Sequence, residues 1–301
     1  MAETRMRPFH LALMLLVNVV WGLNFAAIAY TVSALPPILA NALRFLVVLL
    51  FLFPFLRRPV RQKGRLFAIA VLLGILHFGA VFLAMSRAID MAPIAIVAQM
   101  SVPFSTLLAV LLLGERIGPW RVIGMAVAFS GVAILSFEPG AGEADLGAIL
   151  LTLFSAFVFA LVAILMRRLR DTHSMTVQAW VAAAAVPGSL LLSALFETGQ
   201  GAALARAPVT AFLAVAYSGI FASIIGHGLT YWLLQRYEVS TVAPYMLLAP
   251  LFAVLSAVLL LGEHLDAGDL WGGMLSLAGV LLITIRNRKR QPLGAGTTPP
   301  T

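Results

Sequence analysis

Two stretches of the chain share one pattern: residues 91–135 read MAPIAIVAQMSVPFSTLLAVLLLGERIGPWRVIGMAVAFSGVAIL, and residues 239–283 read VSTVAPYMLLAPLFAVLSAVLLLGEHLDAGDLWGGMLSLAGVLLI. The run LLLGE stands at 111–115 and again at 259–263, an offset of 148 residues. In each copy an apolar segment with an internal proline ends at Gly-Glu, and a second apolar segment with two glycines spaced by seven follows. We interpret Gly-Glu as a helix stop with a capping carboxylate, and the glycines as sites of close helix approach.

The composition of the 301 residues places the chain in the membrane. It is 61% hydrophobic and 11% charged, with a mean hydropathy of +1.01. A soluble domain of this kind would expose far more apolar area than monomers usually tolerate. Cysteine is absent, which excludes disulfides, thiol catalysis and cysteine metal sites. We therefore predict an all-α membrane protein that needs no cofactor or metal.

The apolar runs predict ten transmembrane helices, since each is long enough to cross ~30 Å of hydrocarbon. The expected spans are about 10–30, 36–56, 66–86, 92–113, 119–137, 146–166, 175–196, 209–234, 240–261 and 269–285. With both termini in the cytoplasm, 17 Lys and Arg residues fall in inner loops and tails and 2 in outer loops. The positive-inside rule requires this orientation. The basic residues lie at helix ends, so the net charge of +8 does not indicate a nucleic-acid partner.

The duplication divides the chain into two repeats of five helices, at 8–140 and 145–287, followed by a basic tail at 288–301 that we expect to be disordered. Because five is odd, the second repeat enters the membrane inverted relative to the first. Inverted repeats around a midplane site are a recurring architecture of secondary transporters. The chain is accordingly predicted to be a transporter, for which a monomer would suffice.

Several motifs resemble those of the EamA-type transporters of the drug/metabolite transporter superfamily. They are Val20-Trp21-Gly22-Leu23-Asn24-Phe25, Leu43-Arg44-Phe45 and the two Gly-Glu helix ends; Pro36-Pro37, Tyr237-Glu238 and Val242-Ala243-Pro244 are similar to the branch of bacterial amino-acid and metabolite exporters, including those for cysteine and O-acetylserine. Exporters of aromatic amino acids share the fold with weaker motif agreement. The resemblance covers residues 10–287 and implies a central cavity, a bacterial inner-membrane location and outward movement of small metabolites.

Polar groups inside the spans are the candidates for a substrate site, because each is costly in hydrocarbon unless it faces protein or water. Arg44 lies about eight residues into its span, and no Asp or Glu lies at comparable depth. Its guanidinium suits a substrate carboxylate; alternatively, Arg44 binds carbonyls at the ends of neighbouring helices or extends outward to the membrane interface. His77 and His227 occupy equivalent helices of the two repeats. They line the cavity, carry a proton or serve a structural role.

Further lining candidates share helix faces with these residues or lie on facing spans. The predicted cavity residues are His77, His227, Arg44, Trp21, Asn24, Gln99, Tyr217, Tyr231 and Tyr245, and the predicted hinges or kinks are Pro93, Pro103, Pro244 and Pro250. Prolines in membrane helices remove a backbone donor and are tolerated where protein or cavity water satisfies the freed carbonyl.

The sequence thus predicts export of amino acids and related metabolites by alternating access. Without a carboxylate in any span the usual Asp/Glu proton relay is missing, so coupling would use the histidines or a sodium site, or transport would be facilitative. A carrier or flippase of sugar-nucleotide or lipid-linked conjugates is the alternative, although it would need a basic cluster at cavity depth. An intramembrane enzyme is disfavoured, since paired aspartates and a His-Glu-x-x-His helix are absent.

Overall fold

The computed structural model describes residues 6–114, 117–136, 143–167, 169, 172–234, 236–237, 242 and 245–288, and within these ranges it is helical, without a β-strand. The helices are α1 (Pro8–Ala34), α2 (Pro37–Leu52), α3 (Lys63–Val71), α4 (Phe78–Met85), α5 (Met91–Val97), α6 (Ser101–Leu113), α7 (Pro119–Ser136), α8 (Glu143–Arg167), α9 (Ser174–Phe196), α10 (Gln200–Arg206), α11 (Val209–Tyr217), α12 (His227–Leu234), α14 (Ala249–Ser256) and α15 (Ala267–Arg288). Five short segments of 3-10 or π-helix continue them: η1 (Phe53–Arg57), η2 (Leu72–His77), η3 (Ala98–Met100), η4 (Ser218–Gly226) and η5 (Ala257–Leu261).

Nine helical stretches in the described part of the chain are long and apolar enough to cross a membrane. They coincide with nine of the ten expected spans, from Pro8–Ala34 to Ala267–Ile285. The expected span at 240–261 falls partly on residues outside the described ranges, and its described part contains the shorter apolar helix Ala249–Leu261. The predicted tail from residue 289 onward also lies outside them. The all-helical membrane prediction is therefore confirmed.

The helix ends follow local sequence rules. Pro8 and Pro37 each begin a helix, where the missing amide hydrogen costs nothing. Gly114 and Gly262 end theirs in the left-handed region, with φ of 66° and 74°. Next to Gly262, the carboxylate of Glu263 accepts the amides of Met91 and Ala92 at 2.7 and 3.0 Å. The interpretation of Gly-Glu as a stop with a capping carboxylate is confirmed here, although the capped helix is α5; Glu115 lies outside the described residues.

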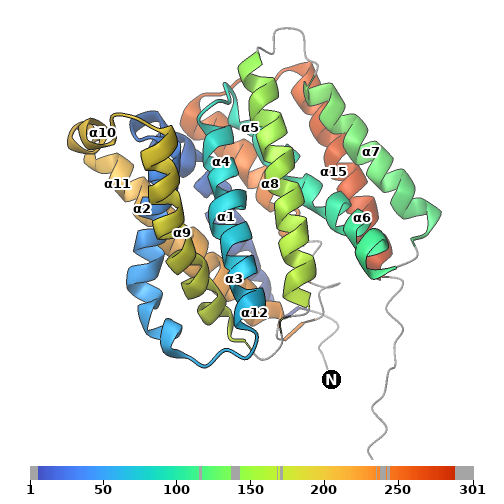
Figure 1. Cartoon of the computed structure of the whole chain (residues 1–301). Coiled ribbons are helices and arrows are strands. Elements are labelled where there is room, and N and C mark those ends of the chain that lie inside the picture. The colour runs from blue at the N-terminus through green and yellow to red at the C-terminus, as the bar shows by residue number, and fades with distance from the viewer. Residues whose placement is uncertain are drawn as a thin grey trace, which may run out of the picture.

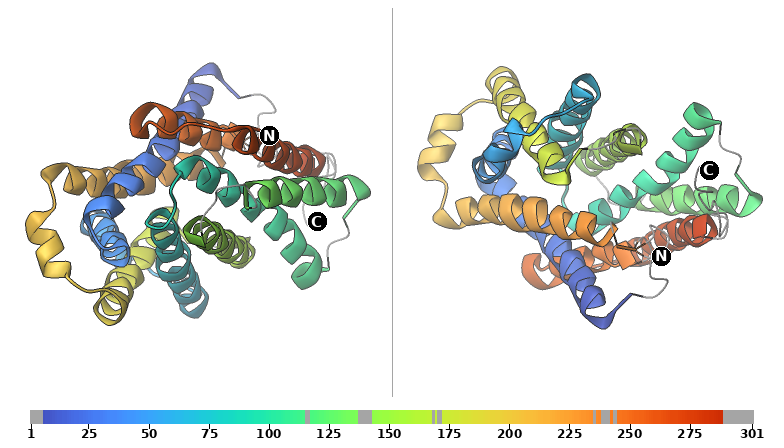
Figure 2. Two further views of the ribbon diagram at one scale, coloured as in Figure 1. Left: turned by 90° about the horizontal axis from the view of Figure 1, so that it is seen from above. Right: turned by 90° about the horizontal axis from the view of Figure 1, so that it is seen from below.

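Helices α7 and α15 pack side by side at one end of the bundle, while α10 lies at the opposite end (Figures 1 and 2). The contact is closest at glycines: a Cβ on Gly279 would lie 2.5 Å from the Gly124 oxygen, and a Cβ on Gly272 would lie 2.9 Å from the Gly131 oxygen. Because Gly124 faces Gly279 while Gly131 faces Gly272, the two helices run antiparallel. The predicted close approach at these glycines is confirmed.

Helix α1 crosses the bundle in contact with α14, α11 and η4. A Cβ on Gly22 would overlap the backbone of Phe252, and the Ser256 hydroxyl donates to the Gly22 carbonyl at 3.1 Å. Helix α2 packs against α9, η4 and α4. The segments α1, α2, η2, α9 and η4 therefore meet in the interior, and the polar groups described next lie there.

Candidate functional site

Two π-helical segments end at or directly before the two histidines that the sequence singled out. Segment η2 ends at His77, and η4 ends at Gly226, directly before His227. A π-helix shifts its hydrogen bonds to the fifth residue back, and such bulges are frequent at functional sites. The same irregularity thus stands at both histidines, a feature that the apolar sequence pattern does not indicate.

His227 is held by the π-helix itself. Its Nδ1 lies 3.0 Å from the Ala222 carbonyl, which accepts a second hydrogen bond from Trp21 Nε1 of α1 at 3.1 Å. The Trp21 and His227 rings meet edge to face, with centroids 5.3 Å apart. Since a carbonyl only accepts, Nδ1 carries the hydrogen, and Nε2 of a neutral ring remains an acceptor.

His77 has a similar setting, with its partners on α8. Its Nδ1 lies 3.1 Å from the Ser155 carbonyl of α8 and 2.7 Å from the Ser155 hydroxyl. Its ring packs against Phe159, with centroids 5.0 Å apart. Each histidine therefore directs Nδ1 to a backbone carbonyl and places its ring against an aromatic residue of another helix.

Arg44 is buried between α2 and η4, with 1% of its surface exposed. Its Nε and Nη2 donate to the Ser223 hydroxyl at 3.2 and 3.0 Å, and its guanidinium carbon lies 4.2 Å from the centroid of the Phe78 ring. Ser223 donates in turn to the Ser218 carbonyl, and the Gln178 amide donates to the Ser223 carbonyl. Nη1 is buried without a partner, and no carboxylate of the described residues pairs with this cation.

We call Arg44, His77, Ser223 and His227 the interior cluster, and the other predicted cavity residues lie next to it or elsewhere in the bundle. Tyr217 donates to the Val20 carbonyl at 3.0 Å and so ties α11 to α1 near Trp21. Asn24 is half-buried with a buried Oδ1 that has no partner among the described residues. Gln99 lies in η3, which packs against α8, and Tyr245 packs against an apolar cluster that includes Met14 and Leu233. The side chain of Tyr231 lies outside the described part of the structure, and so does the whole of Pro244.

The remaining predicted prolines lie at helix starts or breaks. Pro93 is in the first turn of α5, Pro250 is the second residue of α14, and Pro103 follows η3, which interrupts the span between α5 and α6. Sequence reasoning missed Ser155 and Gln178, and it gave Ser223 no role. A short polar residue within an apolar span is the only signal that could have suggested them.

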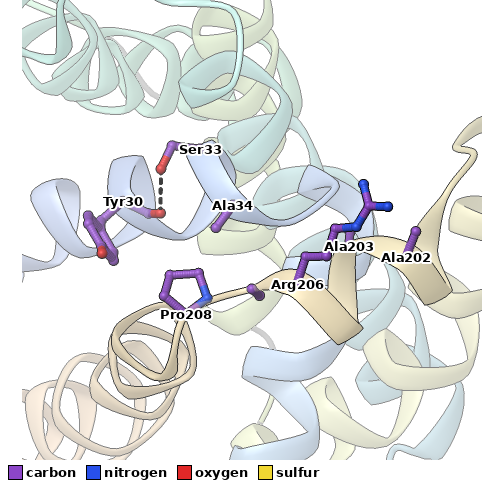
Figure 3. A pocket seen from close by; sticks show the side chains of 8 residues that line it. Tyr30, Ser33, Ala34, Ala202, Ala203, Arg206 and Pro208 are labelled. Atoms are coloured by element: carbon purple, nitrogen blue, oxygen red, sulfur yellow. Dashed lines mark hydrogen bonds between the residues drawn. The ribbon is translucent and has the colours of Figure 1, made fainter.

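Two open pockets adjoin the C-terminal end of α1, away from the interior cluster. One, about 500 Å³ in volume, is lined by Tyr30, Ser33 and residues of the α10 region including Arg206 (Figure 3). The Ser33 hydroxyl donates a hydrogen bond to the Tyr30 carbonyl. The other, about 510 Å³, shares Tyr30 and Ser33 and reaches Asp90, Glu263 and His264.

Comparisons with known proteins add the evolutionary context. The model of the EamA-like transporter family matches residues 9–137 and, a second time, residues 146–285. A probable amino-acid metabolite efflux pump of Salmonella typhimurium is 31% identical over 287 residues, covering 93% of this chain and 96% of that protein. An Escherichia coli protein of the same description is 30% identical and covers 95% and 98%. A solved crystal structure, 21% identical, covers 95% of this chain and 100% of its own with a TM-score of 0.64, a likeness of fold.

Proposed function

The chain belongs to the EamA-like transporter family, and we propose that it is an inner-membrane exporter of amino acids and related small metabolites. The family and the two efflux-pump relatives indicate a transporter rather than an enzyme. The observation that carries the substrate assignment is the interior cluster, in which Arg44 and His77 come from the first matched stretch, and Ser223 and His227 come from the second. A buried cation without a carboxylate partner suits a small carboxylate-bearing solute.

The proposed architecture is two inverted five-helix repeats, 8–140 and 145–287, with both termini in the cytoplasm. The antiparallel pairing of α7 and α15 supports it, because Gly124 and Gly279 exchange roles with Gly272 and Gly131 under the 148-residue offset. Ser276 also donates to the carbonyl of Ala128, the residue exactly one offset before it, at 3.2 Å. A residue that contacts its own repeat equivalent lies near a twofold axis.

Alternating access would use this symmetry, because two similar halves can exchange conformations around one site. The π-helical segments next to His77 and His227 supply irregular backbone at matching depths of both halves. We propose that the histidines line the path and that transport is facilitative, with proton coupling through them as the alternative. A carrier of phosphate-bearing conjugates fits less well, since Arg44 is the one Lys or Arg buried within the described spans.

The test is solute counterflow in proteoliposomes that contain the purified chain, with a panel of amino acids and with or without an imposed pH gradient. Exchange of amino acids that does not depend on the gradient supports a facilitative exporter. Flux that the gradient stimulates, and that the His77→Ala/His227→Ala double variant loses, would instead establish proton coupling. An absence of counterflow with every amino acid would refute the substrate assignment and favour the conjugate carrier.

A further inference from the structure

One turn of α2 carries two buried side chains that each leave an atom without a hydrogen bond. Asn41 and Arg44 are three residues apart, so they share a face of the helix. The Asn41 amide nitrogen donates to the Gly74 carbonyl at 3.0 Å and to the Ser189 hydroxyl at 2.9 Å. Because the Gly74 carbonyl only accepts, the amide orientation is fixed, and Oδ1 is the atom left unpaired. The turn thus presents an unpaired acceptor, Asn41 Oδ1, and an unpaired cationic donor, Arg44 Nη1.

Segment η4 covers this turn and adds a third unpaired group, the Ser218 hydroxyl. The approach is close: a Cβ on Gly219 would lie 2.9 Å from Val47 Cβ and 3.1 Å from the Arg44 carbonyl oxygen. Ser223 connects the two elements, since it accepts from Arg44 and donates to the Ser218 carbonyl at 3.0 Å. The unpaired atoms of Arg44 and Ser218 therefore belong to the contact between α2 and η4, and Asn41 lies one turn away on the same face of α2, where its amide contacts η2 and α9.

Such a group of atoms is expensive unless it has a ligand. A buried polar atom without a partner loses its hydration without compensation, and a buried charge loses more. Unsatisfied buried groups are few in native proteins, so two on one turn of α2 and a third on the segment that packs against it call for an explanation. Here the set consists of a cationic donor, an amide acceptor and a hydroxyl. An α-amino acid zwitterion offers the complement, a carboxylate that accepts and an ammonium that donates.

We propose that Asn41, Arg44 and Ser218 form the subsite that recognises the backbone of a zwitterionic amino acid. Arg44 Nη1 binds one carboxylate oxygen, Asn41 Oδ1 accepts from the ammonium group, and the Ser218 hydroxyl donates to the second carboxylate oxygen. Ser223 is a positioning residue, because it fixes the other two guanidinium nitrogens. The three atoms are shielded from solvent in this structure, and movement of η4 away from α2 opens the subsite. The inference rests on the proposed function and specifies its substrate class.

The test is a competition experiment with the full chain in proteoliposomes. Counterflow of the best-transported amino acid is measured against three unlabelled competitors: the same amino acid, its carboxamide and its des-amino acid. Since a hydrogen bond to a charged group is lost with either analogue, the wild type should prefer the parent compound by about tenfold or more. Arg44→Gln should erase the preference over the carboxamide, and Asn41→Ala the preference over the des-amino acid.

Asn18 supplies a matched control, because it is also fully buried on a membrane helix with an unpaired Oδ1. The Asn18→Ala variant should keep both preferences. If the wild type exchanges amino acids but all three competitors are equally effective, the subsite is wrong while the exporter stands. An absence of counterflow with every amino acid overturns the proposed function itself. Should Arg44→Gln or Asn41→Ala fail to fold, the neutral Arg44→Met and the smaller Asn41→Ser replace them, and the wild-type comparison still shows whether both charged groups of the amino acid are recognised.

Discussion

Replacing Gly279 by alanine should loosen the contact between α7 and α15. The added Cβ would lie 2.5 Å from the Gly124 carbonyl oxygen and 2.8 Å from Ala128 Cα, and both are backbone atoms that cannot rotate away. Overpacking of this kind costs about 1–3 kcal/mol. Alanine recovers about 0.5–1 kcal/mol of helix propensity, so we expect a net loss of roughly 1–2 kcal/mol. The measurement is the thermal unfolding midpoint of the purified variant in detergent.

Gly147 is the matched control, because a Cβ there would meet nothing within 4 Å and the residue is also helical. Gly147→Ala should therefore raise the midpoint slightly, through a gain of about 0.5–1 kcal/mol. Gly131 lies one repeat offset before Gly279, and its Cβ would lie 2.5 Å from the Gly272 oxygen. If the twofold relation holds, Gly131→Ala should match Gly279→Ala. A Gly279→Ala variant as stable as the wild type would refute the packing and the argument built on it.

Four further predictions follow from individual contacts. Burial raises the pKa of Glu263 and outweighs the lowering by its hydrogen bonds to the Met91 and Ala92 amides, while Asp90 and Asp269 raise it further. Since the folded state holds this proton more tightly, the stability of the wild type should fall as the pH rises from the ordinary glutamate range through the raised pKa. The unfolding midpoint of Glu263→Gln should fall less over the same pH range. Midpoints of wild type and variant that fall in parallel would contradict this prediction. Gly262→Ala should lower the free energy of unfolding by about 1–2 kcal/mol, because the φ of Gly262 is 74°. Gly201→Ala is the control, since a Cβ there meets nothing within 4 Å. Thermal unfolding midpoints of the two variants measure the difference. Ser223→Ala removes the hydroxyl that accepts from Arg44, so it should lower stability by about 1–3 kcal/mol and weaken amino-acid counterflow; unchanged values would dismiss its positioning role. Because the chain lacks cysteine, Arg206→Cys should react with an impermeant thiol reagent added to intact cells and Arg65→Cys should not; the reverse pattern would invert the proposed orientation.

Most of the fold could be predicted because it depends on properties that can be read directly along the sequence. Apolar length alone sets a membrane span, so nine of the spans match helices within a few residues. The glycine spacing likewise predicted positions of close helix approach, although it did not indicate that α7 and α15 are the two partners. The short helix α10 was not predicted, since it begins after a left-handed Gly199 in a loop without strong apolar periodicity.

The site could be predicted only in part, because its geometry depends on contacts that are distant in sequence. Arg44 and the two histidines stood out as costly groups in apolar spans. Their partners did not, since Ser155 is 78 residues from His77 and Ser223 is 179 residues from Arg44. The π-helical segments could not be predicted either, because the one residue that a π-helical turn inserts does not change the apolar character of a span.

The proposed twofold relation also shows that Arg44 breaks the symmetry between the two repeats. Structural features tend to recur at both proposed repeats: the glycines at the α7–α15 contact, the π-helical segments and the histidines at their C-terminal ends. Residue 192, one offset beyond Arg44, is a leucine, and the residue at the same offset from Asn41 is Ser189, which accepts its hydrogen bond. A symmetric scaffold can alternate between two states, but a zwitterion has a positive and a negative end, and binding it in one orientation requires side chains that break the symmetry. Asn41 and Arg44 are where the α2 and α9 helices differ in this way.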